Sequence, residues 1–387
     1  MAGVKPSLLF LVTEDWYFMS HRAELARAAV EAGFDVSLVT QVSRHEAEIR
    51  DMGIALYPVV FPRSFRRPWQ DIRTLTGTCK ALRAASPDIV HHVSLKPIVI
   101  GSLLHKTGPC AGNKPAVINA FTGLGYVFTS QKFSARMIRA ILVPLLKSLL
   151  RGRNHFLLFQ NRDDMRMMID QGIARENQCT LIPGSGVNVH KYSPTEEPEG
   201  PPVCTLVSRM LYDKGVQDFV EAARLVKEQG VNARFVLVGD TDPENPAGIP
   251  EHVLQSWHRD GNIEYLGRQQ DVSDVYANSH IVVLPSHREG FPKTVIEAAA
   301  CARPVITTDV PGCRDAIVPG ETGKLVPAKD PGALAAAMIE LINDKQQRER
   351  LGRAGRSLVE EKYASGVINS QFIKLYRKII NKEPEEK

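Results

Sequence analysis

One stretch near residue 290 constrains the fold of this chain more than any other. It begins with a short apolar run at 281–286, which is typical of a buried parallel strand. A loop with Gly290 follows, and residues 293–301 have the composition of a helix, with Pro292 where its first turn begins. A strand that passes through a glycine-containing loop into a helix is the repeating unit of a parallel α/β sheet.

The same alternation runs through most of the 387 residues and predicts an α/β protein with doubly wound parallel sheets. Ser20 is placed to cap a helix over 21–32, and Gly312 and residues 320–323 have the composition of turns. Further strands are expected at 8–12, 36–40, 55–59, 89–92, 154–160, 179–183, 203–207, 234–238, 263–266 and 304–307. We divide the chain into an N-terminal domain (1–192), a linker (193–202), a second domain (203–364) and a C-terminal helix with a charged tail (365–387).

The chemistry expected at residues 287–297 is the binding of a phosphate next to a diol. A helix N-terminus presents free N–H groups that favour an anion, and the carboxylates of Glu289 and Glu297 suit vicinal hydroxyls. Phosphate and diols together describe a nucleotide sugar. The alternative is that an acidic residue only complements the helix dipole, and that two glutamates eight residues apart occur by chance.

The composition and motifs of the chain argue against several other classes of protein. A net charge of +5 suits an anionic membrane surface but is too weak to indicate nucleic acid. The six cysteines are scattered, with no Cys-x-x-Cys pair, so we expect reduced thiols in a cytoplasmic protein. No apolar run approaches the ~20 residues that span a bilayer, and no Gly-x-Gly-x-x-Gly motif indicates a nicotinamide cofactor.

The sequence Glu289-Gly-Phe-Pro, followed by Glu297-Ala, resembles the donor-site signature of family-4 retaining glycosyltransferases with the GT-B fold. The resemblance implies that Glu289 contacts the transferred sugar and that Glu297 holds the ribose diol. Arg209 and Lys214 would grip the donor diphosphate. The remaining donor-site residues that the resemblance implies are Gly290, Phe291, Pro292, Lys293, Thr294 and Val295, through main-chain groups, and Leu266 near the nucleobase.

That family has two Rossmann-like domains facing across a cleft, and a last helix that crosses back to the first domain. It implies retaining transfer of a hexose or N-acetylhexosamine from a nucleotide sugar, with UDP favoured, and no metal or other cofactor. The sequence Asp240-Thr241-Asp242 can in principle hold a divalent ion. We interpret it as a turn because Pro243 and Pro246 lie in the same loop.

The acceptor is expected at loops of the first domain. The sequences around His91-His92, and Gly123-Leu-Gly-Tyr, resemble enzymes that extend polyprenyl-diphosphate-linked or related surface glycans. Many members place a histidine after the fifth strand, where this chain has Ala120-Phe121-Thr122. The candidate acceptor residues are Trp16, His21, His92, Lys96, Thr122 and Gly123. The alternative is that the aromatic and histidine side chains only pack at strand ends.

Residues 131–153 interleave apolar and basic side chains without any acid, and residues 61–69 place aromatic rings among cations. This pattern predicts peripheral contact with the inner face of the cytoplasmic membrane. The alternative is an ordinary sheet-packing helix with a basic rim. The expected membrane residues are Arg136, Arg139, Lys147, Arg66 and Trp69.

Three other functions stay open at this point. The acceptor can be soluble or a lipopolysaccharide core, the protein can be a sugar-nucleotide epimerase of the same fold, or it can be an inactive scaffold. Intact Glu289, Glu297, Arg209 and Lys214 argue against the scaffold.

Overall fold

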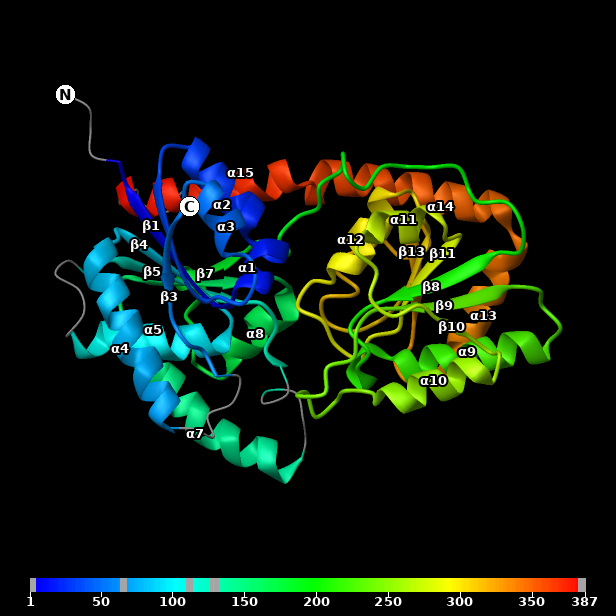
Figure 1. The fold of residues 1–387 in the computed structure, drawn as a ribbon, viewed down its shortest axis with the longest axis horizontal. Helices are drawn as coiled ribbons and strands as arrows, with labels where there is room; N and C mark the ends of the chain where they lie inside the picture. The colour runs from blue at the N-terminus through cyan, green and yellow to red at the C-terminus, as the bar shows by residue number, and fades with distance from the viewer. Residues whose placement is uncertain (1–4, 63–67, 109–113, 126–127, 129–131, 382–387) are drawn as a thin grey trace. The chain divides into compact units, whose positions relative to one another are not determined.

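A computed structural model of the chain describes residues 5–62, 68–108, 114–125, 128 and 132–381. The chain divides into two compact units (Figure 1). Unit 1 comprises Met1–Ser185 and Ile368–Lys387, and unit 2 comprises Gly186–Val367. Each unit contains its own parallel sheet, so the predicted α/β class is confirmed.

Unit 1 contains a seven-stranded parallel sheet in the order β3-β2-β1-β4-β5-β6-β7. The strands are β1 (Ser7–Glu14), β2 (Asp35–Gln41), β3 (Ala55–Pro58), β4 (Ile89–Val93), β5 (Ala116–Phe121), β6 (His155–Phe159) and β7 (Cys179–Leu181). The helices are α1 (Asp15–His21), α2 (Ala23–Glu31), α3 (Glu46–Asp51), α4 (Pro68–Ala85), α5 (Leu95–Thr107), α7 (Phe133–Leu150) and α8 (Arg162–Asp170), with a short turn η1 (Glu176–Gln178).

The central strand β1 shows why this sheet is covered on both faces. Leu8, Phe10 and Val12 belong to one apolar cluster, which also contains residues of α2. Leu9 and Leu11 belong to another, which contains residues of α4 and α5. Because successive side chains of a strand point to opposite faces, a continuous apolar strand requires helices on both sides.

Unit 2 contains a six-stranded parallel sheet in the order β10-β9-β8-β11-β12-β13. The strands are β8 (Val203–Val207), β9 (Arg234–Val238), β10 (Glu264–Tyr265), β11 (Ile281–Leu284), β12 (Val305–Thr308) and β13 (Gly323–Val326). The helices are α9 (Val216–Glu228), α10 (Glu251–Arg259), α11 (Val272–Ala277), α12 (Lys293–Ala300), α13 (Pro331–Asn343) and α14 (Lys345–Leu358). A short 3₁₀ helix, η2 (Tyr212–Lys214), and a π-helix, η3 (Val359–Tyr363), complete the unit.

The last helix, α15 (Ser365–Asn381), returns the chain to unit 1. Its side chains Ile368, Phe372 and Tyr376 are buried in the same apolar cluster as Phe10 of β1. Burial of an apolar stripe along the helix holds this segment in the core of unit 1.

Four sequence predictions are wrong. Ala120 and Phe121, which the sequence analysis places after the fifth strand, are the last two residues of strand β5 itself, whose apolar run is interrupted by the polar Asn119. Ser20 lies inside α1, where its hydroxyl bonds the Tyr17 carbonyl at 3.2 Å, and α2 starts after Arg22 without a side-chain cap. Gly323 opens strand β13 instead of ending a turn. A Cβ atom there would lie 2.7 Å from the Val305 carbonyl, so glycine permits the close pairing with β12. Cys79 is disulfide-bonded, whereas the sequence analysis expects reduced thiols. That prediction failed because scattered positions in a sequence do not show which thiols meet in space.

Candidate functional site

The glycine loop and α12 form the centre of the candidate site in unit 2. Strand β11 lies between β8 and β12, and its carboxyl end leads through the loop to α12. Pro292 is the N-cap, one residue before the position expected. The loop packs closely on Gly312, whose φ is +80° and whose missing Cβ would lie 2.6 Å from the carbonyl oxygens of Glu289 and Gly290. Glycine at 312 therefore fixes the loop's path.

Glu289 and Lys214 meet although they are far apart in the sequence. Lys214 Nζ lies 2.5 Å from Glu289 Oε1, and the Ser286 hydroxyl donates to the same oxygen at 2.8 Å. Both side chains are mostly buried but reach solvent. Burial and the negative charge of Glu289 raise the pKa of the nearby Cys313 thiol to about 12, so that this group stays neutral.

The loop that carries Lys214 is held against the glycine loop by main-chain contacts. The Asp213 carbonyl accepts from the N–H of His287 at 2.9 Å and from the Ser286 hydroxyl at 3.3 Å. Gly215 has a φ of +69°, and a Cβ there would lie 2.0 Å from the Pro285 carbonyl. The close approach that glycine allows is what brings Lys214 to Glu289.

Glu297 lies one turn into α12 and is almost buried, with 8% of its surface exposed. Its carboxylate accepts from the Tyr276 hydroxyl at 3.3 Å and pairs with Lys293 Nζ at 3.3 Å. The Tyr192 hydroxyl lies near the same carboxylate. Burial, with a smaller contribution from the Glu297 charge, raises the pKa of both tyrosines, so both remain protonated donors.

The remaining donor-site candidates lie in α12, in the loop before it, and after strand β10. The Thr294 hydroxyl donates to the Val207 carbonyl at 3.0 Å, and Phe291 packs on Tyr363 with ring centroids 5.0 Å apart. Leu266 follows β10 with 49% of its surface exposed. An exposed apolar side chain suits contact with the face of a planar ring.

Arg209 is separate from the Glu289–Lys214 pair. Its guanidinium bonds Asp242 at 3.1 Å, and Asp240 pairs with Arg268 at 3.5 Å. Both carboxylates of Asp240-Thr241-Asp242 are therefore engaged by arginines. Within the described ranges, no three His, Cys, Asp or Glu side chains are grouped as a metal site would need.

In unit 1, two of the acceptor candidates are held inside the protein. His92 is 1% exposed, its Nδ1 lies 3.0 Å from Asn119 Oδ1, and burial lowers its pKa to about 3. A Cβ on Gly101 would lie 2.0 Å from His92 Nε2, so α5 covers the ring. Lys96 is engaged by Asp71 at 3.1 Å and by the Pro62 carbonyl. The ring of His92 is buried in this structure, and its assignment to acceptor binding stays a prediction.

The other acceptor candidates lie at the ends of β1 and β5 and are partly exposed. The Trp16 indole donates to Glu14, and the ring of His21 stacks on Tyr17 with centroids 4.2 Å apart. Thr122 and Gly123 directly follow β5. The neighbouring buried Asp15, which sequence reasoning missed, organises this region.

Asp15 accepts backbone bonds from Ser43 at 2.7 Å and from Arg44 at 2.8 Å. These bonds, with that of the Ser43 hydroxyl, overcome burial and hold its pKa far below the usual range. A carboxylate directly after the first strand is the only sequence signal that would have indicated it.

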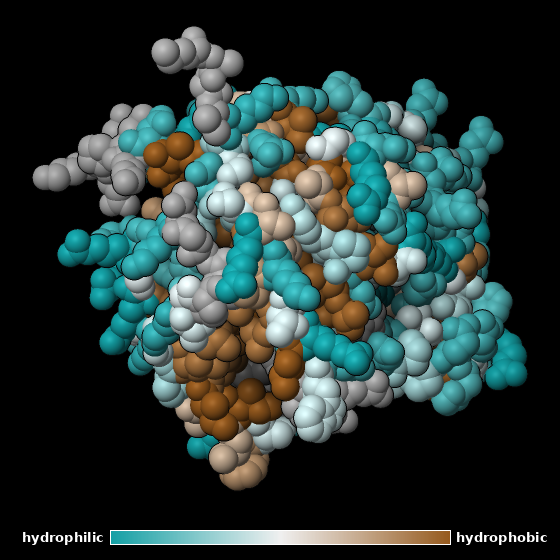
Figure 2. All heavy atoms as spheres, turned by 60° about the vertical axis from the view of Figure 1, so that its left-hand side comes forward, coloured by the Kyte–Doolittle hydropathy of each residue, from teal (hydrophilic) through white to brown (hydrophobic). Residues whose placement is uncertain are grey.

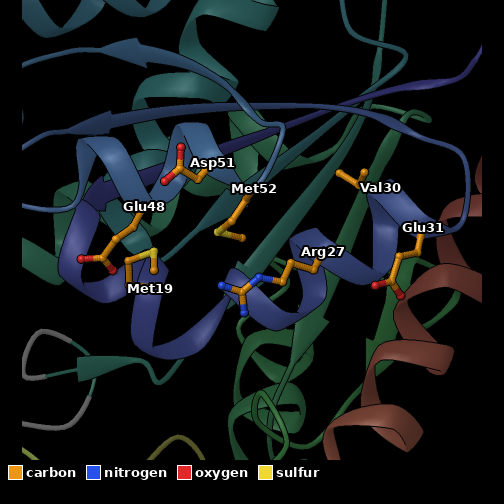
Figure 3. A pocket seen from close by; sticks show the side chains of 7 residues that line it. All are labelled: Met19, Arg27, Val30, Glu31, Glu48, Asp51 and Met52. Atoms are coloured by element: carbon orange, nitrogen blue, oxygen red, sulfur yellow. The ribbon is translucent and has the colours of Figure 1, made fainter.

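A pocket of about 490 Å³ is lined by residues of α1, α2 and α3 and by Met52. Its lining side chains are Met19, Arg27, Val30, Glu31, Glu48, Asp51 and Met52 (Figure 3). The mixture of charges lining it does not define a ligand class.

Helix α7 exposes the apolar face that its sequence pattern suggested. Phe133 is 78% and Ile141 70% exposed, and brown side chains gather at the lower edge of the face in Figure 2, where Figure 1 shows α7. Trp69, at the start of α4, is 76% exposed. Arg136 is exposed, Arg139 and Lys147 are half-buried, and Arg66 lies outside the described residues. No helix among the described residues is long and apolar enough to cross a bilayer.

Two family models match this chain, one in each unit. Residues 7–161 match "Glycosyl transferase 4-like", and residues 191–358 match "Glycosyl transferases group 1".

Two relatives and one solved structure show how far the similarity extends. The chain is 27% identical over 385 residues to the N,N'-diacetylbacillosaminyl-diphospho-undecaprenol alpha-1,3-N-acetylgalactosaminyltransferase of Campylobacter jejuni, covering 94% of this chain and 98% of the relative. It is 24% identical to the UDP-Gal:alpha-D-GlcNAc-diphosphoundecaprenol alpha-1,3-galactosyltransferase of Escherichia coli, covering 71% and 72%. The sucrose-phosphate synthase structure from Thermosynechococcus elongatus superposes with a TM-score of 0.80 at 20% identity, covering 98% of this chain and 100% of that one.

Proposed function

Because the chain belongs to the glycosyltransferases, with a 4-like domain followed by a group 1 domain in a GT-B fold, we propose that it is a retaining, metal-independent enzyme. It transfers a hexose or N-acetylhexosamine from a nucleoside-diphosphate sugar, with UDP favoured, to a saccharide on a polyprenyl diphosphate. The product belongs to surface polysaccharide or glycoconjugate assembly. The observation that carries the donor side is the convergence of Lys214, Ser286 and Glu289 beside the N-terminus of α12.

The charges around α12 suit a diphosphate next to a sugar. The first N–H groups of the helix and the ammonium of Lys214 supply positive potential, and Glu289 supplies an acceptor for sugar hydroxyls. Arg209 is half-exposed, and a rotation away from Asp242 would let it reach a phosphate. Glu297 accepts the ribose diol, and exposed Leu266 contacts the nucleobase.

In the proposed reaction, the acceptor hydroxyl attacks the anomeric carbon on the face from which the diphosphate leaves. The bond from that carbon to the phosphate oxygen breaks as the new glycosidic bond forms, and a diphosphate oxygen takes the proton of the acceptor. The protein stabilises the charge that builds on the leaving group and positions the reactants. Lys214 and Arg209 stabilise that charge, and Glu289 orients the sugar.

The lipid-linked acceptor is proposed from two lines of support. Both relatives reported above act, by their names, on undecaprenyl-diphosphate-linked sugars. Independently, α7 exposes Phe133 and Ile141 beside basic residues, which suits an anionic lipid surface. We propose that this face docks peripherally on the inner face of the cytoplasmic membrane, with Trp16, His21, Thr122 and Gly123 on the acceptor side.

A product screen tests the proposal. The purified chain is incubated with single nucleotide sugars, and with short polyprenyl-diphosphate saccharides in mixed micelles, and products are read by mass spectrometry with and without a chelator. We expect one added sugar residue on the lipid-linked acceptor, in both conditions. A nucleotide sugar epimerised without any acceptor, or extension of soluble saccharides alone, would overturn the proposal.

A further inference from the structure

The carboxylate of Glu297 is held by two tyrosines that come from distant parts of unit 2. Tyr276 lies in α11 and donates to Oε2 at 3.3 Å. Tyr192 lies in the chain segment that connects β7 to β8, and its hydroxyl lies near the same carboxylate, whose charge adds to burial in raising the pKa of this tyrosine. The two rings pack against each other with centroids 6.0 Å apart. Both tyrosines belong to the buried apolar cluster that also contains Val295 and Ile296 of α12.

Both tyrosines are buried, which limits the partners that their hydroxyls can bond. Tyr276 is 0% and Tyr192 8% exposed, so each hydroxyl needs a partner within the protein. A buried hydroxyl that bonds a carboxylate makes a charge-assisted hydrogen bond, which is stronger than a neutral one. The carboxylate therefore has little freedom to rotate.

The segment that carries Tyr192 is itself fixed to α12. The guanidinium of Arg356 donates to the carbonyls of Tyr192 at 2.7 Å, Val189 at 3.1 Å and Ala300 at 2.6 Å. Ala300 ends α12, the helix of Glu297. Tyr192 and Glu297 are therefore held in one rigid group.

The number of acceptor positions shows which partners stay when a ligand arrives. A carboxylate has about four such positions. The two tyrosines leave two acceptor positions for the hydroxyls of a diol. Lys293, whose side chain is 32% exposed, is therefore the partner that must move away from the carboxylate when the diol binds. We propose that Tyr192 and Tyr276 are positioning residues that orient Glu297 to accept both hydroxyls of the donor ribose. This inference rests on the ribose role proposed for Glu297.

Nucleotide binding tests it without any acceptor. Calorimetry measures the Kd of UDP, ADP and GDP for the wild type, and then the tightest of them is compared with its 2′,3′-dideoxy analogue. The variants are Tyr192→Phe, Tyr276→Phe and Glu297→Gln. Tyr376→Phe is the matched control, because Tyr376 is a fully buried tyrosine in unit 1 whose hydroxyl bonds His91 at 2.7 Å. Thermal unfolding reports the stability of each variant.

We expect the wild type to prefer the ribonucleotide and Glu297→Gln to lose that preference. Each tyrosine variant should bind the ribonucleotide about three- to tenfold more weakly, while the dideoxy analogue binds as before. Tyr376→Phe should lose stability and keep the full preference. If the tyrosine variants keep the preference while Glu297→Gln loses it, the donor assignment stands and the positioning role is wrong. If the wild type binds none of the nucleotides, or shows no preference, the proposed donor site fails and the inference with it.

Discussion

Replacing Glu289 by glutamine separates its charge from its shape. The amide oxygen can still accept from Lys214 and from Ser286, which lie 2.5 Å and 2.8 Å from Oε1. We therefore expect the loop to keep its conformation. What is lost is a charged acceptor for sugar hydroxyls in the transition state. A charge-assisted hydrogen bond contributes about 1.5–3 kcal/mol, which corresponds to a ten- to hundredfold fall in kcat at about 1.36 kcal/mol per decade.

The assay is steady-state transfer from the nucleotide sugar with the lipid-linked acceptor saturating. Glu340→Gln is the control, since Glu340 pairs with Lys324 at 2.6 Å in the same unit but on α13. It should leave kcat unchanged, and both variants should unfold within a few degrees of the wild type. Activity of Glu289→Gln within about twofold of wild type would refute the role of the charge.

Three further predictions concern Lys214, the basic residues of α7 and the buried His155. Lys214→Ala should lower kcat by about two to three orders of magnitude, because it removes one preorganised cation that faces the leaving diphosphate; a change in KM alone would contradict this. Reversal of Arg136, Arg139 and Lys147 to Glu should abolish sedimentation with anionic vesicles, since each cation near such a surface contributes about 1 kcal/mol to binding. Nucleotide affinity should stay the same. Vesicle binding that persists in this variant, or that does not depend on salt concentration, would contradict the prediction. Burial, with a smaller effect of the His105 charge, lowers the pKa of His155 from 6.5 to about 4. As the pH drops, the unfolded chain therefore takes up a proton before the folded chain does. The free energy of unfolding should fall between pH 6.5 and pH 4, by up to about 3 kcal/mol. Denaturant unfolding across this range checks it, and His155→Gln should unfold with a shallower pH dependence than the wild type.

The sequence predicts the strands well because buried parallel strands are short apolar runs. Strand β9 occupies 234–238 as expected, and α12 begins at Lys293. Helix starts are harder to place, since Ser20 has the right chemistry for a cap but lies inside α1. Strand β13 was missed because Gly323 is also a turn residue, and only the approach of Val305 shows why glycine is needed there.

Side-chain environments are less predictable, because they are set by contacts between distant residues. No local pattern shows that Tyr192 and Tyr276 converge on Glu297. A histidine near the end of a strand, such as His92, is a candidate functional residue. Its ring is nevertheless covered by the close packing of Gly101. The motif at 289–297 thus locates the site, and the tertiary structure decides which neighbours complete it.

The stereochemistry of transfer shows whether the enzyme is a retaining, metal-independent glycosyltransferase. The product is made from an α-linked nucleotide sugar and a lipid-linked acceptor in the presence of chelator, and the anomeric proton of the new residue is examined by NMR. We expect an α linkage, with the configuration of the donor retained and no requirement for a metal. A β linkage, or a product that forms only when a divalent cation is restored, would contradict it.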